Sequence, residues 1–188
     1  MVGRSIQRIL LIVAAGVAAA PPAALGQSAV PKEYQVKAAF LFHFVQFVEW
    51  PPSAFASPDS PICIGVLGEN PFGTALEEVV RGEKVQNRNL IVQSAPRVEN
   101  LRDCHLVFIS KSETARMAAI LADLDTRPVL TVSEVDSLTQ RGAVINLFLA
   151  GSKVRFEINP AAARRKGLKI SSQLLSLGRI LDGPEEKR

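Results

Sequence analysis

The ten residues Cys-His-Leu-Val-Phe-Ile-Ser-Lys-Ser-Glu at 104–113 decide the fold of this chain. The first six are mostly apolar, β-branched or aromatic, a density typical of a strand buried on both faces. Ser110 and Glu113 then form a capping box, which marks a helix N-terminus, and the apolar spacing predicts a helix to about Leu124. A buried strand followed directly by a helix is the repeating unit of an α/β fold with a parallel sheet.

The same alternation continues on both sides of this segment. Residues 62–67 predict a second buried strand, and Pro71 suits the first turn of a helix that we expect to reach Arg81. A predicted hairpin joins residues 143–149 to 153–158 through Gly151-Ser152. The other predicted elements are a helix over 34–50, strands at 90–93 and 129–132, a helical turn at 98–102, a short helix that Ser133 and Asp136 cap and Gly142 ends, a short helix from Asn159 to Gly167, and a last amphipathic helix from Ser171 to Leu181. We therefore expect an α/β three-layer sandwich with a largely parallel Rossmann-like sheet, flanking helices, and the C-terminal hairpin as an antiparallel edge.

The first predicted helix is apolar almost all round. One helical stripe carries mostly small and aliphatic side chains, and a second stripe beside it carries three phenylalanines. A helix of this kind is either buried or part of an interface, so we weigh a core helix against a partly exposed face that forms dimer contacts. The first stripe is Tyr34, Ala38, Leu41, Val45 and Val48, and the candidate dimer contacts are Phe40, Phe44 and Phe47.

Residues 1–26 have the pattern of a secretory signal peptide. Arg4 and Arg8 precede an apolar run over residues 9–20, and the small residues before Gly26 fit a cleavage site. A retained membrane anchor is the alternative, but this run is shorter than the about 20 residues that span a bilayer. We expect export to the periplasm.

The mature chain should then be a single domain over residues 27–181, with a disordered tail over residues 182–188. Loss of Arg4 and Arg8 lowers the formal charge from +4 to +2. Binding to nucleic acid depends on a clustered basic face, so we expect no nucleic-acid partner.

The chain offers little for catalysis. Gly65, Gly68 and Gly73 lie at a predicted strand-to-helix turn, but their spacing matches no dinucleotide or phosphate-binding motif. His43 and His105 are the only histidines, and no Gly-x-Ser-x-Gly elbow is present. We expect neither an enzyme nor a metal site nor a cofactor.

The only two cysteines, Cys63 and Cys104, stand at the start of two predicted strands. An even number of cysteines in an oxidising compartment favours a disulfide, and this topology can place the two strands side by side. Two buried free thiols are the alternative.

A basic cluster accompanies the predicted hairpin and the helix after it: Arg155, Arg164, Arg165, Lys166 and Lys169. Most such clusters are solvated faces, but Arg155 and Glu157 share one face of a strand, which can meet a partner or an anionic ligand. The candidate partner or ligand surface is therefore Arg155, Glu157 and Lys169. A second possibility is a small-ligand receptor that uses a crevice where Gly68, Asn70 and Ser110 gather.

Several blocks of sequence resemble the YfiR family, in the same order and over about residues 33–181. They are Tyr34-Gln-Val-Lys-Ala-Ala-Phe-Leu41, Phe47-Val-Glu-Trp-Pro51, Cys63-Ile-Gly-Val-Leu-Gly68 and Leu168-Lys-Ile-Ser-Ser-Gln-Leu-Leu175. Each block alone would be weak, whereas the four together are specific.

The resemblance implies a periplasmic, non-enzymatic regulator. In the best-understood type, a homodimer binds the periplasmic sensor part of an inner-membrane diguanylate cyclase and represses it, and an outer-membrane peptidoglycan-binding lipoprotein can sequester the repressor. Cyclic di-GMP and biofilm formation then rise. Cys63 and Cys104 resemble one disulfide of that type, while a second, later disulfide has no counterpart here. Related domains also precede histidine kinases, so the resemblance leaves the partner open.

Overall fold

The structure, a computed structural model, describes residues 30–135 and 142–181. The predicted signal peptide and the predicted tail lie outside these residues. The predicted short helix that starts at Ser133 and Asp136 also lies almost wholly outside them. The described elements, in chain order, are α1 (Lys32–Phe47), β1 (Val48–Glu49), η1 (Pro52–Ala54), β2 (Ile62–Leu67), α2 (Ala75–Val80), β3 (Lys84–Val85), β4 (Arg88–Ala95), η2 (Val98–Leu101), β5 (Leu106–Ile109), η3 (Lys111–Arg116), α3 (Met117–Asp125), β6 (Leu130–Ser133), β7 (Ile145–Ala150), β8 (Lys153–Ile158), α4 (Pro160–Arg165), β9 (Lys169–Ile170), α5 (Ser172–Leu177) and β10 (Arg179–Ile180).

One mixed sheet organises the molecule, with the strand order β10-β8-β7-β6-β5-β2-β4-β3. The five strands from β7 to β4 are mutually parallel, and β5 pairs with β2 from Ile64↔Leu106 to Leu67↔Ile109. The β7–β8 and β3–β4 pairs are antiparallel. This arrangement confirms the predicted α/β sandwich with a mostly parallel sheet and an antiparallel hairpin.

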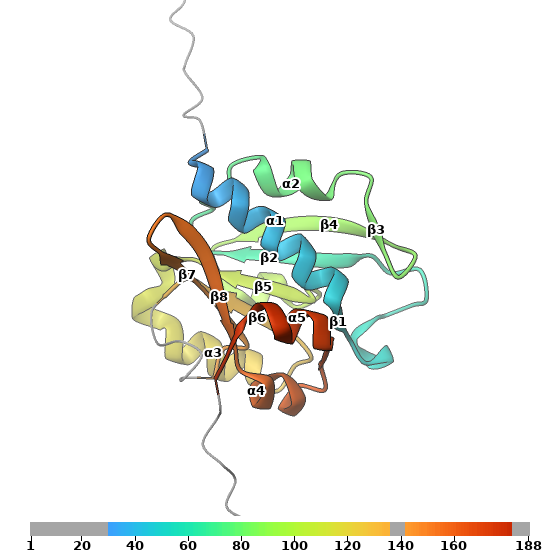
Figure 1. Cartoon of the computed structure of the whole chain (residues 1–188). Coiled ribbons are helices and arrows are strands. Elements are labelled where there is room, and N and C mark those ends of the chain that lie inside the picture. The colour runs from blue at the N-terminus through green and yellow to red at the C-terminus, as the bar shows by residue number, and fades with distance from the viewer. Residues whose placement is uncertain (1–29, 136–141, 182–188) are drawn as a thin grey trace, which may run out of the picture.

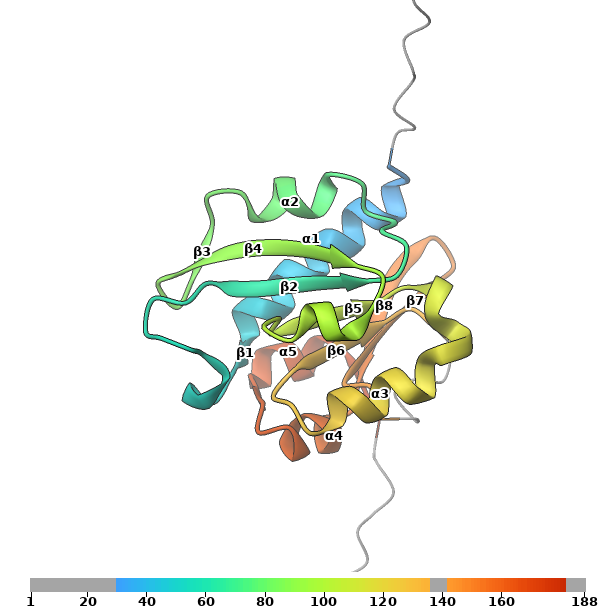
Figure 2. The same cartoon turned by 180° about the vertical axis from the view of Figure 1, so that it is seen from behind.

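Helices cover both faces of the sheet, because its central strands are buried on both sides (Figures 1 and 2). Alternate residues of β2 point to opposite faces, as the pleat requires. Ile64 and Val66 join the core under α1, α2, α4 and α5, whereas Cys63 and Leu67 join the core under η2 and α3.

The first helix is shorter than predicted. It ends at Phe47, and Val48–Glu49 form a two-residue strand antiparallel to β9. The Phe47 carbonyl accepts a hydrogen bond from Ser171 N at 3.0 Å. Tertiary pairing thus replaces the last helical turn, and Trp50 follows it in a buried position.

The C-terminal end also differs from the prediction. The last helix ends at Leu177, and extended Gly178 leads into β10, which pairs in parallel with β8. A side chain at Gly178 would collide with the Phe156 ring, so this close approach requires glycine. The hairpin is therefore covered by a further strand and is not the edge of the sheet.

Two other predictions were inaccurate. The helix predicted over residues 71–81 is regular only over Ala75–Val80, and the strand predicted over residues 90–93 extends over Arg88–Ala95. Its partner β3 was missed, because Gln86 and Asn87 both adopt positive φ (52° and 63°) without a glycine to mark the turn.

Candidate functional site

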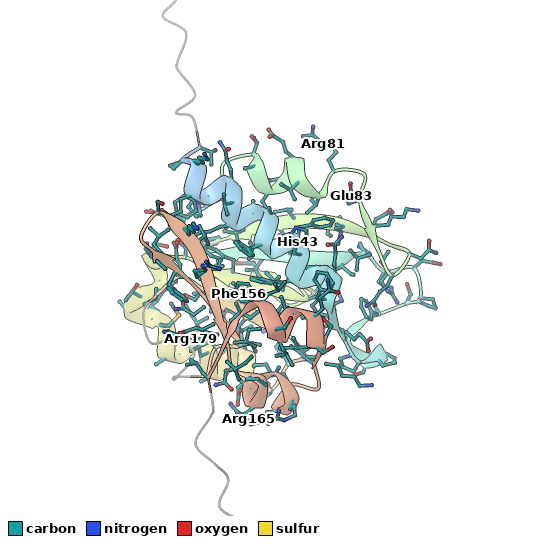
Figure 3. The ribbon with its side chains drawn as sticks, viewed as in Figure 1. His43, Arg81, Glu83, Phe156, Arg165 and Arg179 are labelled. Carbon is teal, nitrogen blue, oxygen red and sulfur yellow. A yellow bond between two sulfur atoms is a disulfide. The ribbon has the colours of Figure 1, made fainter. Side chains whose placement is uncertain are left out.

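The β7–β8 hairpin extends beyond the sheet and has surfaces on both sides. Only Ile145 and Asn146 pair with β6, so the rest of β7 continues past the end of that strand, and Gly151 closes the turn with φ +62°. The hairpin packs against the second half of α1 through Phe156, which Figure 3 labels; its ring lies 5.5 Å from Phe40 and 5.1 Å from Phe44.

An apolar groove of about 730 Å³ lies between α1 and the hairpin. Leu149 is 51% exposed and Val36 is 38% exposed, and the half-buried Phe40 and Val154 complete its floor. Four charged side chains also line it: Lys32, Glu33, Lys153 and Arg155. An apolar centre with a charged rim is the usual composition of a protein interface.

A polar pocket of about 540 Å³ lies on the other side of the hairpin. Glu157 is buried there and forms an ion pair with Arg179 on β10. The Arg179 guanidinium also lies 5.0 Å from the centre of the Phe148 ring. Arg179 therefore joins the end strand to the hairpin, and the sequence analysis missed it because the β8–β10 pairing was not foreseen.

A buried charge cluster borders this polar pocket. Lys37 is 1% exposed and forms ion pairs with Glu33 and with the equally buried carboxylate of Glu134. Tyr34 donates a hydrogen bond to Glu134 at 3.1 Å, and Lys111 approaches the same carboxylate at 3.8 Å. Burial and the negative charge of Glu134 raise the pKa of Tyr34 to about 12. The sequence analysis missed the cluster, although Glu33 and Lys37 have the i, i+4 spacing of a helical ion pair.

The structure separates the predicted partner residues. Arg155 lies at the apolar groove and Glu157 in the polar pocket, on the same strand. Lys169 pairs with Glu49 in strand register beyond the C-terminus of α1, a helix of about 24 Å. The three residues therefore form no single surface in one copy of the chain.

The three phenylalanines of the predicted dimer surface differ in exposure. Phe44 has no exposed area and belongs to the core, stacked on Phe40 at 5.9 Å. Phe40 and Phe47 are half-buried, so of the three phenylalanines only these two have exposed area that a second copy of the chain could contact. In the stripe beside them, Ala38, Leu41, Val45 and Val48 are fully buried, as a core helix requires.

Gly68, Asn70 and Ser110, which were predicted to gather at a crevice, each have close neighbours in the chain. A side chain at Gly68 would collide with Ser112 and Glu113 of η3. The exposed Asn70 donates a hydrogen bond to Ser94 Oγ at 3.2 Å. Ser110 is buried and caps η3 through Ser112 N, not through the predicted capping box with Glu113.

The disulfide between Cys63 and Cys104 is formed, with the two Cα atoms 4.4 Å apart. It lies at the start of β2 and β5, beside a pocket of about 550 Å³. This amino-terminal edge of the parallel strands is opposite to the edge from which the hairpin extends.

His105 lines the same pocket and is 5% exposed. Its Nδ1 accepts a hydrogen bond from Cys63 N at 3.2 Å, so the neutral ring carries its proton on Nε2. Burial lowers the pKa of His105 and outweighs the raising effect of the nearby Ala54 backbone. That backbone group does not reach hydrogen-bond geometry, and Nε2 has no partner within the described residues.

Within residues 30–135 and 142–181, no cluster of three or more histidine, cysteine or acidic side chains could hold a metal ion. The helices of the same segments are all too short or too polar to cross a bilayer.

Lys166, part of the predicted basic cluster, is buried and donates to the Leu124 carbonyl at 2.5 Å, so it joins α4 to α3 and is not part of a solvated face.

The described residues thus present an apolar groove with a charge-lined pocket beside it, and surfaces of this composition are typical of protein interfaces. The chain belongs to the YfiR/HmsC-like family (DUF4154), whose model matches residues 34–179. The family is regulatory and non-catalytic, its members are periplasmic, and it acts in cyclic di-GMP signalling. Among curated proteins, no match was found.

One solved structure with a similar fold is a conserved domain protein from Vibrio cholerae O1 biovar El Tor, with a TM-score of 0.54 and 10% sequence identity. The match covers 79% of this chain and 60% of the Vibrio chain, so this chain spans less than two thirds of that protein's length. At this identity the similarity concerns the fold alone.

Proposed function

We propose that the protein is a periplasmic repressor that binds the periplasmic sensor part of an inner-membrane diguanylate cyclase and holds the enzyme inactive. Cyclic di-GMP and biofilm formation would fall as a result. Membership of a regulatory, non-catalytic family supports this function. The structural observation that carries it is the apolar groove between α1 and the β7–β8 hairpin, because this surface has no cover within the described residues.

The groove has the features that a partner would need. Leu149 and Val36 present exposed aliphatic surface at its centre, and burial of such surface is the main favourable term in association. Arg155 and Lys153 on the hairpin, with Glu33 on α1, supply charges at the rim that can orient the partner. Repression then follows if the protein binds the inactive state of the sensor more tightly than the active state.

From the sequence we predicted that Phe40 forms a dimer contact and that Arg155 belongs to the partner surface. Both residues line this groove. We assign the groove to the membrane partner. A second copy of the chain seated there would compete with the partner, so light scattering on the purified protein distinguishes the two occupants. Phe47, at the far end of α1, remains available for a homodimer contact in either case.

The test compares Leu149→Glu with Leu177→Glu as a matched control. Leu177 is 64% exposed on α5 and does not line the groove. We expect Leu149→Glu to weaken binding to the periplasmic sensor about tenfold or more, because one buried aliphatic contact is worth about 1–2 kcal/mol. Leu177→Glu should bind and repress normally. Equal binding by both variants would contradict the assignment of the groove.

A small-ligand sensor that feeds a histidine kinase or another membrane signalling protein is the second candidate. The pocket of about 550 Å³ beside the disulfide favours it, since pockets of this size hold small molecules. Capture of a histidine kinase from solubilised inner membranes, in place of a cyclase, would support this function.

A further inference from the structure

The pocket beside the Cys63–Cys104 disulfide has a chemistry that neither the apolar groove nor the family accounts for. It opens at the amino-terminal edge of β2, β5 and β6, away from the hairpin, and its volume is about 550 Å³. It shares no lining residue with the groove between α1 and the hairpin.

The outer wall of the pocket is held in place by Arg88. Its Nη1 donates to the carbonyls of Ser57 and Ser60 at 3.1 and 2.6 Å, which fixes the loop over residues 51–61 to strand β4. The Arg88 guanidinium also lies 3.7 Å from the centre of the Phe55 ring. The ring in turn stacks on His105 at 4.5 Å. Phe55 therefore lies between the Arg88 guanidinium and the His105 ring, and it forms the wall of the pocket over His105.

The lining combines apolar surface with an excess of positive charge. Ile91 lines the pocket and is 44% exposed, whereas Val129, just before β6, also lines it but is only 2% exposed. Arg102 and Arg127 line the pocket against a single acid, Asp103. Because Arg127 donates through Nη2 to the Leu101 and Arg102 carbonyls, its guanidinium is fixed in position. Such a lining favours a ligand with a negative end and an apolar body.

His105 supplies the second observation. The hydrogen bond from Cys63 N to Nδ1 leaves the Nε2 proton as a donor, and no acceptor meets it within the described residues. Buried donors are nearly always satisfied, so an unsatisfied one in the wall of a pocket indicates a missing acceptor. A carboxylate beside the ring would provide it, after a small shift of the Phe55 ring that covers it.

We propose that this pocket binds a small organic carboxylate with an apolar body. The two arginines would hold the carboxylate, Ile91 and Phe55 would cover the apolar part, and His105 would donate to an oxygen of the ligand. The site is independent of the proposed repressor function, because it lies on the other edge of the sheet from the groove.

The test uses the purified mature protein, residues 27–188, with phenylacetate as the probe. Trp50, the only tryptophan, reports on the site, because its Nε1 donates to the His105 carbonyl at 3.0 Å. Fluorescence titration, checked by calorimetry, should give a dissociation constant of about 1 mM or below, as expected for a ligand of this size. Acetate and phenylacetamide should each bind about tenfold more weakly, since one lacks the apolar body and the other lacks the charge.

Two variants locate the binding. Arg102→Gln removes an exposed cation of the pocket and should weaken phenylacetate about fivefold. Arg97→Gln, the control, removes an exposed arginine that does not line the pocket and should leave the affinity unchanged. Absence of any response to phenylacetate at about ten times the expected constant would overturn the proposal. So would equal affinity for phenylacetamide, or equal weakening by the two variants.

Discussion

Removal of the Cys63–Cys104 disulfide should lower the free energy of unfolding by an amount that can be calculated from the length of the loop it closes. The bridge joins residues 41 positions apart and connects β2 to the segment just before its neighbour β5. Both cysteines are 3% exposed, so replacement of both by alanine places no polar group in the core. The perturbation is therefore mainly the loss of a covalent restraint on the unfolded chain.

The magnitude follows from the length of the closed loop. Counting both cysteines, the loop contains 42 residues, one more than the separation of 41. The chain-entropy relation then gives a loss of about 13 cal/mol/K in the unfolded state, or about 4 kcal/mol at 25 °C. For a domain of this size, that is a large share of a typical free energy of unfolding of about 5–15 kcal/mol.

Urea unfolding followed by Trp50 fluorescence measures this effect, because Trp50 is 7% exposed and becomes solvated on unfolding. Wild-type protein kept reduced is the matched control, since it retains both sulfur atoms and lacks only the bond. We expect the double alanine variant and the reduced protein to lose a similar amount, near 4 kcal/mol. A loss below about 1 kcal/mol in both would refute the reasoning.

Three other predictions concern the buried charge cluster. Lys37→Met should lower the free energy of unfolding by about 3–5 kcal/mol, because it leaves the buried Glu134 carboxylate without its buried cation. The control Lys111→Gln should lower it by less than about 1 kcal/mol, because Lys111 is exposed. Similar losses for the two variants in urea titrations would contradict this prediction. Tyr34, the only tyrosine, should ionise near pH 12 in an absorbance titration, and Glu134→Gln should lower that midpoint toward 10; a wild-type midpoint at 10 would be inconsistent with the cluster. Since folding raises this pKa, the stability that Tyr34 contributes is fully present below pH 10 and is lost as pH rises from 10 to about 12, which stability measurements at a series of alkaline pH values would show.

The sequence was most informative where local chemistry determines structure. Residues 62–67 form a strand with the predicted bounds, since an apolar run of this density and short length is typical of a strand buried on both faces. Asn159 caps α4 as predicted, with its side chain accepting from Ala162 N at 2.9 Å. Ser171 caps α5 in the same way.

Pairing between distant residues could not be predicted from local pattern. The two-residue strands β1, β9 and β10 exist only through their partners, and Val48 meets Ile170 across more than 100 positions of the sequence. For the same reason, the burial of Lys37 could not be inferred, because its partner Glu134 is 97 positions away. Strand alternation predicted that Arg155 and Glu157 share one face of a strand, but it could not show that they line two different pockets. The position of Lys169 depends on the β1–β9 pairing, which local pattern does not reveal.

The most direct measurement of the central claim is capture of the membrane partner. The mature protein, residues 27–188, is used as bait on detergent-solubilised inner membranes of its source, beside Leu149→Glu and Leu177→Glu baits, and the retained proteins are identified by mass spectrometry. The account predicts that wild type and Leu177→Glu retain a protein with a periplasmic sensor and a cytoplasmic diguanylate cyclase domain, and that Leu149→Glu does not. Absence of any such cyclase from the wild-type bait, even after cross-linking, would contradict it.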